Sequence, residues 1–373
     1  MTKLKDITGK ALSGEWGTDD ETGVGIPVLR TTNFTNEGIV NYENVVTRII
    51  TKKDISEKYL QSGDIIIEKS GGSDKQPVGR VIYFDGPENT YLFNNFTGLL
   101  RVRDKNEWFP RYVFYSLFAN YKKGGTRPFE NKTTGLHNLK TDDYVSRYEI
   151  PEIPLNKQVA ICAQLDQILK VINLRRKEIS NLDDLIKARF VEMFGDPETN
   201  SKGWAEISLS EKLNVLGGYA FKSDQFEETG GIPVLRIGNI NSGYFKPVNM
   251  VYWKEDRSLE RYAMYPGDLV MSLTGTVGKD DYGNVCILGN AYEMYYLNQR
   301  NAKLELKDGL DKYYLAELLK FSQVKKKLTG ISRGVRQANI SNKDILNLVA
   351  PIPPMELQQQ FANFVEQIAK SKF

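Results

Sequence analysis

The chain has 373 residues, of which 40% are apolar and 26% charged, and its formal net charge is +3. This length gives room for two domains with sizeable cores, and the small net charge neither requires nor excludes a nucleic-acid partner. Two unclustered cysteines and a single histidine argue against a disulfide framework and exclude a histidine-rich metal site. The N-terminus lacks an apolar signal core, and no apolar run approaches the roughly 18 residues of a membrane span, so we expect a cytoplasmic protein.

In chain order, the first recognisable pattern is GIPVLR at residues 25–30, which predicts the start of a strand. Short β-branched and aromatic runs predict further strands, and a longer run predicts a helix. The expected strands are 64–67, 80–84 and 99–102, the expected helix is 110–121, and the glycine-rich stretch 70–79 is expected to be a loop.

The longest pattern follows at residues 155–194, where apolar residues recur every three or four positions. This is the spacing of a heptad seam, with Pro154 at its start and Gly195 at its end. About 40 residues at about 1.5 Å each form a rod of about 60 Å, and a rod with one apolar stripe needs a partner helix. The stripe consists of Ile161, Leu165, Ile168, Ile172, Ile179, Leu182 and Ile186.

The second half of the chain repeats the first. GIPVLR returns at 231–236, and the Gly-Asp that precedes a strand at 63–64 returns at 267–268. Strands at 268–271 and 285–288, a glycine-rich loop at 274–284 and a helix at 311–328 are expected around it. A terminal helical pattern matches the central one, with Gln358, Phe361, Val365 and Ile368 standing where Gln158, Ile161, Leu165 and Ile168 stand. The protein is therefore two copies of one unit of about 200 residues.

These patterns predict an α/β chain, of the α+β type, with two duplicated globular domains separated by a long helix. We expect the domains at 1–150 and 198–350, the central helix at 151–197 and a short terminal helix at 351–373. Phe361, Val365 and Ile368 are expected to pack against the central helix in an antiparallel coiled coil.

The sequence contains no complete catalytic or cofactor motif. Gly278-Lys279 resembles the end of a phosphate-binding loop, but Leu273 and Asp280 stand where that loop has Gly and Ser or Thr. No glycine-rich cofactor fingerprint follows a strand, and the Asn/Asp-Pro-Pro-Tyr/Phe loop of an amino-methyltransferase is missing. We therefore assign no catalytic residue, metal ligand or cofactor to this chain.

A magnesium-dependent nuclease remains as an alternative. Asp268 followed by Glu305-Leu306-Lys307 imitates the carboxylates and lysine that hold magnesium. In the first copy Asp64 persists, but Arg101 stands at the position of Glu305. The simpler interpretation is that the carboxylates of Asp64 and Asp268 bond local backbone N–H groups in a turn.

The two copies differ most in their loops, where Ser, Thr, Asn, Gln, Lys and Arg accompany the glycines. Such side chains contact base edges and phosphates, and glycine lets a backbone approach a ligand. The candidate contacts of the first copy are Thr31, Thr32, Asn33, Lys69, Ser70, Gly71, Gly72, Ser73, Asn94, Asn95, Lys132, Thr133, Thr134, His137 and Asn138. Those of the second copy are Asn239, Asn241, Thr274, Gly275, Thr276, Lys279, Asn298, Gln299, Arg300, Ser332, Arg333, Arg336 and Gln337.

Basic residues cluster near these loops, at 122–123 and Arg127 in the first copy and at 325–327 in the second. The sequence leaves open whether these clusters are solvated surface or phosphate contacts. His137 stands where the second copy has Arg336, and without a neighbouring acid motif it is interpreted as a polar contact.

In this order of features the chain resembles the specificity subunits of type I restriction-modification systems, over essentially its whole length. The resemblance rests on Gly-Ile-Pro-x-Leu-Arg-x-x-Asn at 25–33 and 231–239, on Gly-Asp before an apolar strand at 63 and 267, and on Ile-Pro leading through Gln158 or Gln358 into a heptad helix. It implies that each globular domain is a target recognition domain for one half of a bipartite, asymmetric site on double-stranded DNA. It also implies that the paired helices dock two methyltransferase subunits, which use S-adenosylmethionine, and that restriction and translocase subunits with ATP and magnesium join them.

Members of that family usually end with a second helix as long as the first, whereas this chain lacks counterparts of about 174–195. The resemblance therefore implies that Ile179, Leu182 and Ile186 have no partner within the chain, so that another subunit covers them or assembly is weakened. An uncovered stripe of this kind is expected to make the isolated chain self-associate. Two other functions stay open here: a self-sufficient magnesium-dependent restriction endonuclease, and a tandem-domain binder of a non-DNA ligand.

Overall fold

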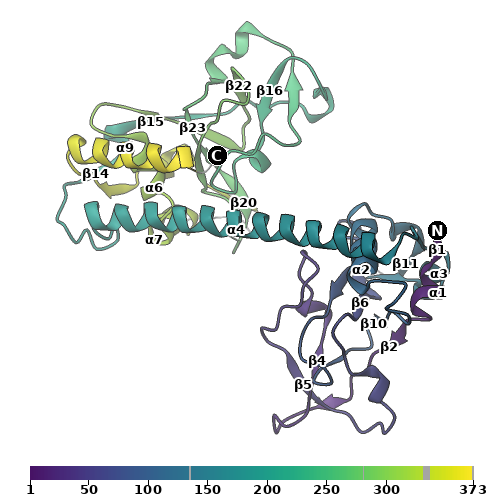
Figure 1. Cartoon of the computed structure of the whole chain (residues 1–373). Helices are drawn as coiled ribbons and strands as arrows, with labels where there is room; N and C mark the ends of the chain where they lie inside the picture. The colour runs from purple at the N-terminus through teal and green to yellow at the C-terminus, as the bar shows by residue number, and fades with distance from the viewer. Residues whose placement is uncertain (134–135, 280, 331–336, 372–373) are drawn as a thin grey trace. The chain divides into compact units, whose positions relative to one another are not determined.

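The protein structure, a computed structural model, describes residues 1–133, 136–279, 281–330 and 337–371. It divides into two compact units, Met1–Leu174 and Arg175–Phe373. Both units combine small sheets with short helices, and the division falls inside helix α4 (Leu155–Phe194), so that each unit includes half of this helix (Figure 1). None of the described helices combines the length and the apolar content that a lipid bilayer requires.

Unit 1 is built around two four-stranded sheets. One runs in the order β2 (Leu12–Ser13), β10 (Thr97–Leu100), β6 (Ile65–Glu68) and β8 (Val81–Tyr83), and the other in the order β3 (Thr18–Asp19), β5 (Val46–Ile49), β4 (Ile26–Leu29) and β9 (Leu92–Phe93). Strand β6 is buried on both faces: Ile65 and Ile67 join the core under helix α2 (Pro110–Lys122), whereas Ile66 joins the core that includes β4. This double burial is why the strand is a continuous apolar run.

Shorter elements complete unit 1. Strands β1 (Thr2–Lys3) and β13 (Glu149–Ile150) pair with each other, and helices α1 (Leu4–Thr8) and α3 (Thr141–Arg147) contact β1 and each other. A third sheet has the order β11 (Glu130–Thr133), β12 (Leu136–Leu139) and β7 (Ser70–Gly72).

Unit 2 repeats the order of the first main sheet strand for strand, and it shares three adjacent strands of the second. The first is β15 (Leu213–Gly217), β23 (Asn301–Leu306), β19 (Leu269–Ser272) and β21 (Val285–Ile287), and the second is β17 (Val251–Trp253), β16 (Ile232–Leu235), β22 (Tyr295–Leu297) and β18 (Ala263–Met264). The parallel pair β4 and β9 returns as β16 and β22. Leu269 and Met271 face one core and Val270 faces another, as in β6. The duplication inferred from the sequence is therefore present in the topology.

Two further strand pairs of unit 2 correspond to the pairs β1 with β13 and β7 with β12 of unit 1. Strand β14 (Glu206–Ser208) pairs with β25 (Val349–Pro351), and β20 (Thr274–Thr276) pairs with β24 (Gln337–Asn339). The helices are α5 (Leu209–Lys212), α6 (Lys312–Leu318), α7 (Ser322–Thr329), α8 (Asn342–Leu346) and α9 (Met355–Ser371).

Two sequence-based expectations about local structure were wrong. The single helix expected at 311–328 is two helices, because the chain tightens through i to i+3 bonds at Lys320 and Phe321 and then extends at Phe321, whose ring is buried against Phe190. The stretches 70–79 and 274–284 are not loops throughout, because their first residues form β7 and β20. Their partner strands, β12 and β24, are distant in sequence, so no local pattern marks the pairing.

Helices α4 and α9 are anchored in the same way. The Gln158 side chain is fully buried, accepts from the backbone N–H of Phe109 at 2.9 Å, and donates to the carbonyls of Glu107 and Ile153 at 2.8 Å. In α9, the equally buried Gln358 accepts from the N–H of Asp311 at 2.8 Å and donates to two carbonyls in the same manner. The sequence match between Gln158 and Gln358 is thus a structural equivalence.

Helix α9 packs against the C-terminal half of α4, within unit 2. The Phe361 ring centroid lies 5.5 Å from that of Phe190 and 5.4 Å from that of Phe194, and the guanidinium of Arg189 lies over Phe364. These contacts lie near the C-terminal end of α4, and α9 also contacts α6; the expected antiparallel coiled coil stays a prediction. Val365 and Ile368, as predicted, pack against this core, and so does Ile186 of α4.

The predicted packing stripe of α4 is therefore correct only at one end. Ile186 is buried, contrary to the expectation that it has no partner within the chain. Ile161, Ile168 and Ile172 are 40% to 55% exposed in the described chain, contrary to their predicted burial in a helix pair. Ile179 is 40% exposed, as expected for a residue beyond the reach of the short terminal helix. The 17 residues of α9 span about 25 Å, which is less than half of the length of α4. Leu165 and Leu182 are half-buried.

Candidate nucleic-acid interface

An exposed turn occupies the same place in both units. In unit 1 it is closed by a hydrogen bond from the N–H of Thr97 to the carbonyl of Asn94, at 3.0 Å, and in unit 2 by one from Asn301 to Asn298, at 2.9 Å. The third residue of each turn, Phe96 or Arg300, also accepts a backbone hydrogen bond, at 2.8 Å, from the residue after β6 or β19. We call Asn94–Thr97 and Asn298–Asn301 the tip turns.

In both units, a second backbone hydrogen bond links the residue that contacts the tip turn to the chain at the end of an equivalent strand. The residue after β6, Lys69, accepts from the N–H of Leu139, and the residue after β19, Leu273, accepts from the N–H of Ile340, both at 2.8 Å. The tip turn, β7 and β12 are therefore neighbours in unit 1, as are the tip turn, β20 and β24 in unit 2. The sequence-predicted segments around 70, 94 and 137, and around 274, 298 and 337, are thereby brought together.

The segment after each GIPVLR strand joins this surface as a short 3₁₀ helix, η1 (Thr31–Asn33) or η5 (Ile237–Asn239). In unit 1, the Arg80 guanidinium donates to the carbonyls of Thr31 and Phe34, at 2.8 and 3.0 Å. In unit 2, the side-chain amide of Asn284 donates to the carbonyl of Asn241 at 2.7 Å. Different residues thus hold equivalent segments in place.

A surface pocket of about 330 Å³ lies among these elements in unit 2. It is lined mostly by polar residues, together with one glycine and one isoleucine: Ile237, Asn241, Thr274, Gly275, Thr276, Asp281 and Arg300. Asp281 is fixed by hydrogen bonds from the N–H and hydroxyl of Thr276, at 2.8 and 3.0 Å. Gly275 permits this contact, because a Cβ there would lie 2.3 Å from the Asp281 carboxylate.

A second pocket, of about 470 Å³, lies in unit 1 and is basic. It is lined by Asn36, Lys75, Gln76, Pro77, Tyr121, Lys122, Lys123, Gly124 and Arg127. Four of these side chains are cationic and none is a carboxylate, which suits a phosphate group. The structure thus places the predicted cluster of Lys122, Lys123 and Arg127 around one concavity.

Two predicted contacts have structural roles instead. Asn33 and Asn239 are almost fully buried, and each side-chain oxygen accepts from the N–H of the GIPVLR arginine at 3.0 Å. Each side-chain nitrogen donates to two carbonyls of the following loop. With their hydrogen-bonding capacity used inside the protein, neither side chain reaches a ligand.

Three further predicted contacts in unit 1 are buried and are likewise corrected. His137 is 4% exposed, and its Nδ1 lies 2.9 Å from the buried carboxylate of Glu130. Asn94 is also 4% exposed, because it is the first residue of the tip turn and lies at its buried base. Gly72 is buried, and a Cβ there would lie 2.6 Å from the backbone nitrogen of Val78.

The other described candidates lie at the surface. Those that are exposed are Thr32, Gly71, Ser73, Asn95, Thr276, Lys279, Gln299 and Arg300, and those that are half-buried are Thr31, Lys69, Ser70, Asn138, Asn241, Thr274, Gly275 and Asn298. Lys69 donates to the Ser13 hydroxyl at 2.9 Å, and burial together with nearby Lys58 lowers the pKa of its ammonium group. Lys132, Thr133 and Gln337 contribute strand backbone, and Thr134, Ser332, Arg333 and Arg336 lie outside the described residues.

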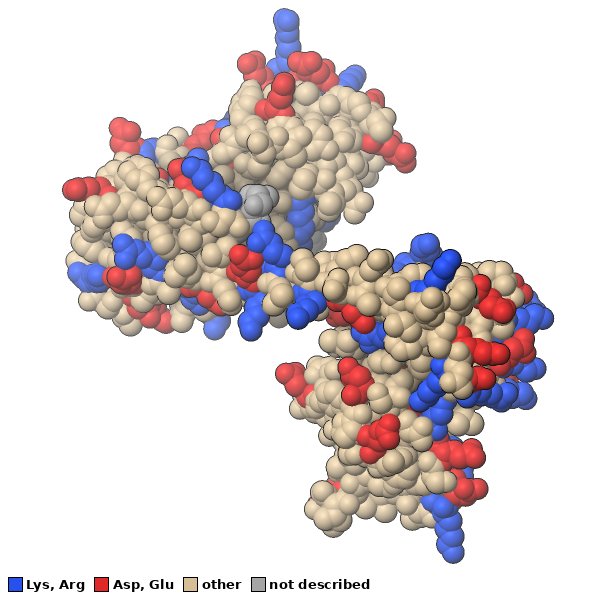
Figure 2. Space-filling view, in the orientation of Figure 1, with Lys and Arg blue, Asp and Glu red and all other residues tan. Residues whose placement is uncertain are grey.

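Sequence reasoning missed Phe96, which is 54% exposed on the tip turn of unit 1. The alignment of Asn94-Asn95-Phe96 with Asn298-Gln299-Arg300 could have identified Phe96 from the sequence. It was missed because only polar residues were considered as DNA contacts. Sequence reasoning also missed Lys75 and Asp281, which border the two pockets. On the face drawn in Figure 2, basic and acidic side chains are interspersed over both units, in keeping with the small net charge.

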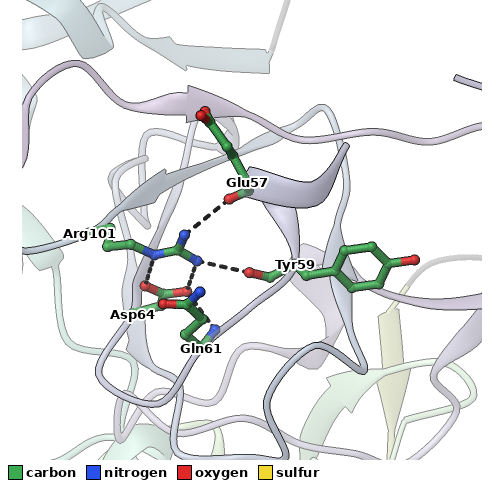
Figure 3. Close-up of polar contacts among 5 residues, drawn as sticks. All are labelled: Glu57, Tyr59, Gln61, Asp64 and Arg101. Atoms are coloured by element: carbon green, nitrogen blue, oxygen red, sulfur yellow. Dashed lines mark hydrogen bonds and ion pairs between the residues drawn. The ribbon is translucent and has the colours of Figure 1, made fainter. Parts of the chain in front are cut away.

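The repeated Gly-Asp aspartates are structural. Asp64 is 2% exposed, and Arg101 donates to its two oxygens at 2.7 and 2.6 Å and to the carbonyls of Glu57 and Tyr59 (Figure 3). The hydrogen bonds to the Asp64 carboxylate raise the pKa of Arg101. The N–H of Gln61 also donates to Asp64, at 2.7 Å, so the predicted turn chemistry is confirmed.

The corresponding group in unit 2 does not form a nuclease-like cluster. Asp268 accepts from the N–H of Tyr265 at 2.8 Å, and its cation is Lys303, at 3.0 Å. Lys307, the lysine of the imitated motif, instead donates to the carbonyl of Ser210 at 2.9 Å. Over the described ranges, no three His, Cys, Asp or Glu side chains are placed to hold a metal ion together.

Comparison with known proteins agrees with this duplicated arrangement. The family model for the type I restriction modification DNA specificity domain matches residues 1–183 and again 201–372. The chain is 26% identical to the type I restriction enzyme MjaVIII specificity subunit of Methanocaldococcus jannaschii, over 77% of this chain and 71% of that protein. It is 23% identical to the type I restriction enzyme EcoKI specificity subunit of Escherichia coli (strain K12), over 92% of this chain and 75% of that protein.

The fold is also shared with a solved structure. The crystal structure of the type I restriction-modification system S subunit from M. genitalium superposes with a TM-score of 0.55 at 16% identity, over 99% of this chain and 89% of that one. Both the family match and the shared sheet topology identify the same two copies. The chain therefore belongs to the family of type I restriction-modification DNA specificity domains, of which it carries two.

Proposed function

We propose that this chain is the sequence-recognition subunit of a type I restriction-modification complex, in which each unit reads one half of a bipartite DNA target. The observation that supports this most strongly is the pair of tip turns. Their backbone hydrogen bonds are the same, but Phe96 stands in one where Arg300 stands in the other. A shared framework that carries different exposed side chains reads two different sequences, so the target is asymmetric.

The proposed role is not catalytic. Candidate nuclease carboxylates are paired with cations inside each unit, at Asp64 and Asp268. Methylation would come from methyltransferase subunits that bind S-adenosylmethionine, and cleavage from restriction and translocase subunits that use ATP and magnesium. The relatives described above are named specificity subunits, which supports this division of labour. DNA as the substrate implies a cytoplasmic location.

The N-terminal half of α4 offers a surface for the methyltransferase subunits. Ile161, Ile168, Val171, Ile172 and Leu174 are each at least 40% exposed, although they continue the apolar spacing of the helix. Such a stripe is costly to leave in water, and a second subunit that covers it stabilises the assembly. We propose that two methyltransferase subunits dock along this helix.

The test is an adenine-methylation map of the genome of cells that express this chain with its neighbouring methyltransferase, compared with cells that lack this chain. A bipartite motif with a fixed gap, present only with this chain, is the expected result. The gap between the two half-sites is expected near one turn of DNA, about 34 Å. If the two proteins co-purify and no new motif appears, the proposed function is wrong.

A binding measurement separates DNA from a non-DNA ligand. The affinity of the assembled complex for a duplex that contains the motif should fall steeply as salt concentration rises, because phosphate contacts release counterions. Salt-independent binding, or none, would instead favour a tandem-domain binder of another ligand.

A further inference from the structure

The third residue of each tip turn is the most sharply differing position at an otherwise matched place. Phe96 and Arg300 accept equivalent backbone hydrogen bonds, both at 2.8 Å, from Lys69 and Leu273. Both side chains are exposed, so neither is required by the core. Two exposed residues at equivalent backbone positions can determine which base is recognised at the matching position of each half-site.

The surroundings of Arg300 match a G·C base pair. Arg300 lines the unit 2 pocket together with Asp281 and Asn241. No residue in the described ranges forms an ion pair or hydrogen bond with this guanidinium, so its donors are available. A guanidinium donates two parallel hydrogen bonds to N7 and O6 of guanine, which is the commonest specific contact in the major groove.

Asp281 supplies the complementary acceptor. Thr276 fixes its carboxylate through two hydrogen bonds, and a carboxylate has about four lone-pair sites, so acceptor capacity remains. Cytosine presents its N4 amino group in the major groove, and Asp or Glu is the side chain that accepts from it. A donor fork and a carboxylate around one pocket therefore suit guanine and its paired cytosine better than an A·T pair.

The chemistry of the Phe96 side chain favours an A·T pair. The ring has no hydrogen-bonding group and is 54% exposed. An apolar side chain that reaches the major groove discriminates bases by contact with the 5-methyl group of thymine. The same ring cannot satisfy the polar edge of a G·C pair, and burying that edge without hydrogen bonds is unfavourable.

We propose that Arg300 reads a guanine in one half-site, with Asp281 oriented toward its paired cytosine, and that Phe96 contacts a thymine methyl at the matching position of the other half-site. This inference rests on the proposed function. It adds the base identity at one position of each half-site, and it assigns specificity to a phenylalanine.

The test uses the full chain assembled with its methyltransferase, and the readout is the methylation motif of wild type, Arg300→Ala and Phe96→Ala. In the Arg300→Ala map, one guanine position is expected to become degenerate, while the gap and the other half-site stay unchanged. In the Phe96→Ala map, one thymine position of the other half-site is expected to become degenerate. Discrimination at each position, measured by competition between matched and substituted duplexes, should fall by about 5- to 150-fold.

Matched variants control for a general loss of positive charge or of apolar surface. Arg257→Ala removes the same charge from an exposed position of unit 2, on the 3₁₀ helix η6 (Arg257–Tyr262), and should leave the motif unchanged. Phe96→Leu keeps an apolar contact and should preserve the thymine preference better than Phe96→Ala. Co-purification with the methyltransferase shows that each variant is folded.

The outcomes separate the two proposals. A wild-type complex without a bipartite motif overturns the proposed function together with this inference. A bipartite wild-type motif combined with Arg300→Ala binding that is weakened equally on all sequences makes Arg300 a phosphate contact and overturns the inference alone. Degeneracy of an A·T position in Arg300→Ala, or of both half-sites in either variant, overturns it as well.

Discussion

The buried ion pair between Asp64 and Arg101 makes a quantitative prediction, because unit 2 carries a weaker version of the same contact. Arg101→Met keeps the apolar stem but removes four hydrogen bonds, two to Asp64 and one each to the carbonyls of Glu57 and Tyr59. Asp64, 2% exposed, then keeps only its bond from the N–H of Gln61. Removing one partner of a buried pair costs about 3–5 kcal/mol. The Arg101 side chain is 25% exposed, so we expect about 2–4 kcal/mol.

The matched variant is Lys303→Met in unit 2. Asp268 is 25% exposed and has a single contact with Lys303, at 3.0 Å, so the loss should stay within about 1 kcal/mol. Hydrogen exchange followed by mass spectrometry at increasing urea reports the stability of each unit separately. Equal losses in the two units, or a loss below about 1 kcal/mol for Arg101→Met, would refute the reasoning. Adding Asp64→Asn to Arg101→Met should recover part of the loss, because no unpaired charge then remains buried.

Three further predictions concern pH, thiol reactivity and association. Burial raises the pKa of Glu68 above its ordinary value of 4.5, so its contribution to stability is present below pH 4.5 and is lost as pH rises through the raised pKa. Glu68→Gln should flatten this decline when urea unfolding is measured at a series of pH values above 4.5. Burial raises the pKa of Cys162 to about 11 and that of Cys286 to about 12. A thiol reagent at about pH 8 should therefore label neither cysteine until the protein unfolds, because the thiolate is the reactive form. Rapid labelling of the folded protein would contradict this prediction. The isolated chain should self-associate in sedimentation, and replacing Ile168 and Val171 by Asn should reduce this; a wild-type chain that stays monomeric at all concentrations would count against an uncovered stripe.

Residue type alone did not separate exposed candidates from buried ones. Asn33 and Asn239 were predicted to contact DNA as polar residues of loops that differ between the two copies, yet both are buried and cap a 3₁₀ helix. The same residue type occurs at Asn95, which is exposed on a tip turn. Whether an asparagine is buried or exposed depends on which backbone N–H and C=O groups lie near it in the folded chain. The sequence alone does not give their positions.

The packing of α4 shows the same limit for apolar residues. The heptad pattern correctly predicted a single long helix, and it predicted Val365 and Ile368 as packing positions. It did not determine which turns of α4 they meet, because a heptad repeats along its length and fits a partner at any register. The structure selects the end near Phe190 and Phe194, whose rings pack edge-to-face with Phe361.

The sequence by itself determined the duplication, the strands that carry GIPVLR and Gly-Asp, the long helix and the family resemblance. These depend on local patterns and on order along the chain, and both can be read without coordinates. Only the tertiary structure decided that β7 and β20 are strands, that His137 and Asn94 are buried, and that Phe96 and Arg300 occupy equivalent exposed positions. These facts depend on hydrogen bonds between residues far apart in sequence, and a local pattern carries no information about such partners.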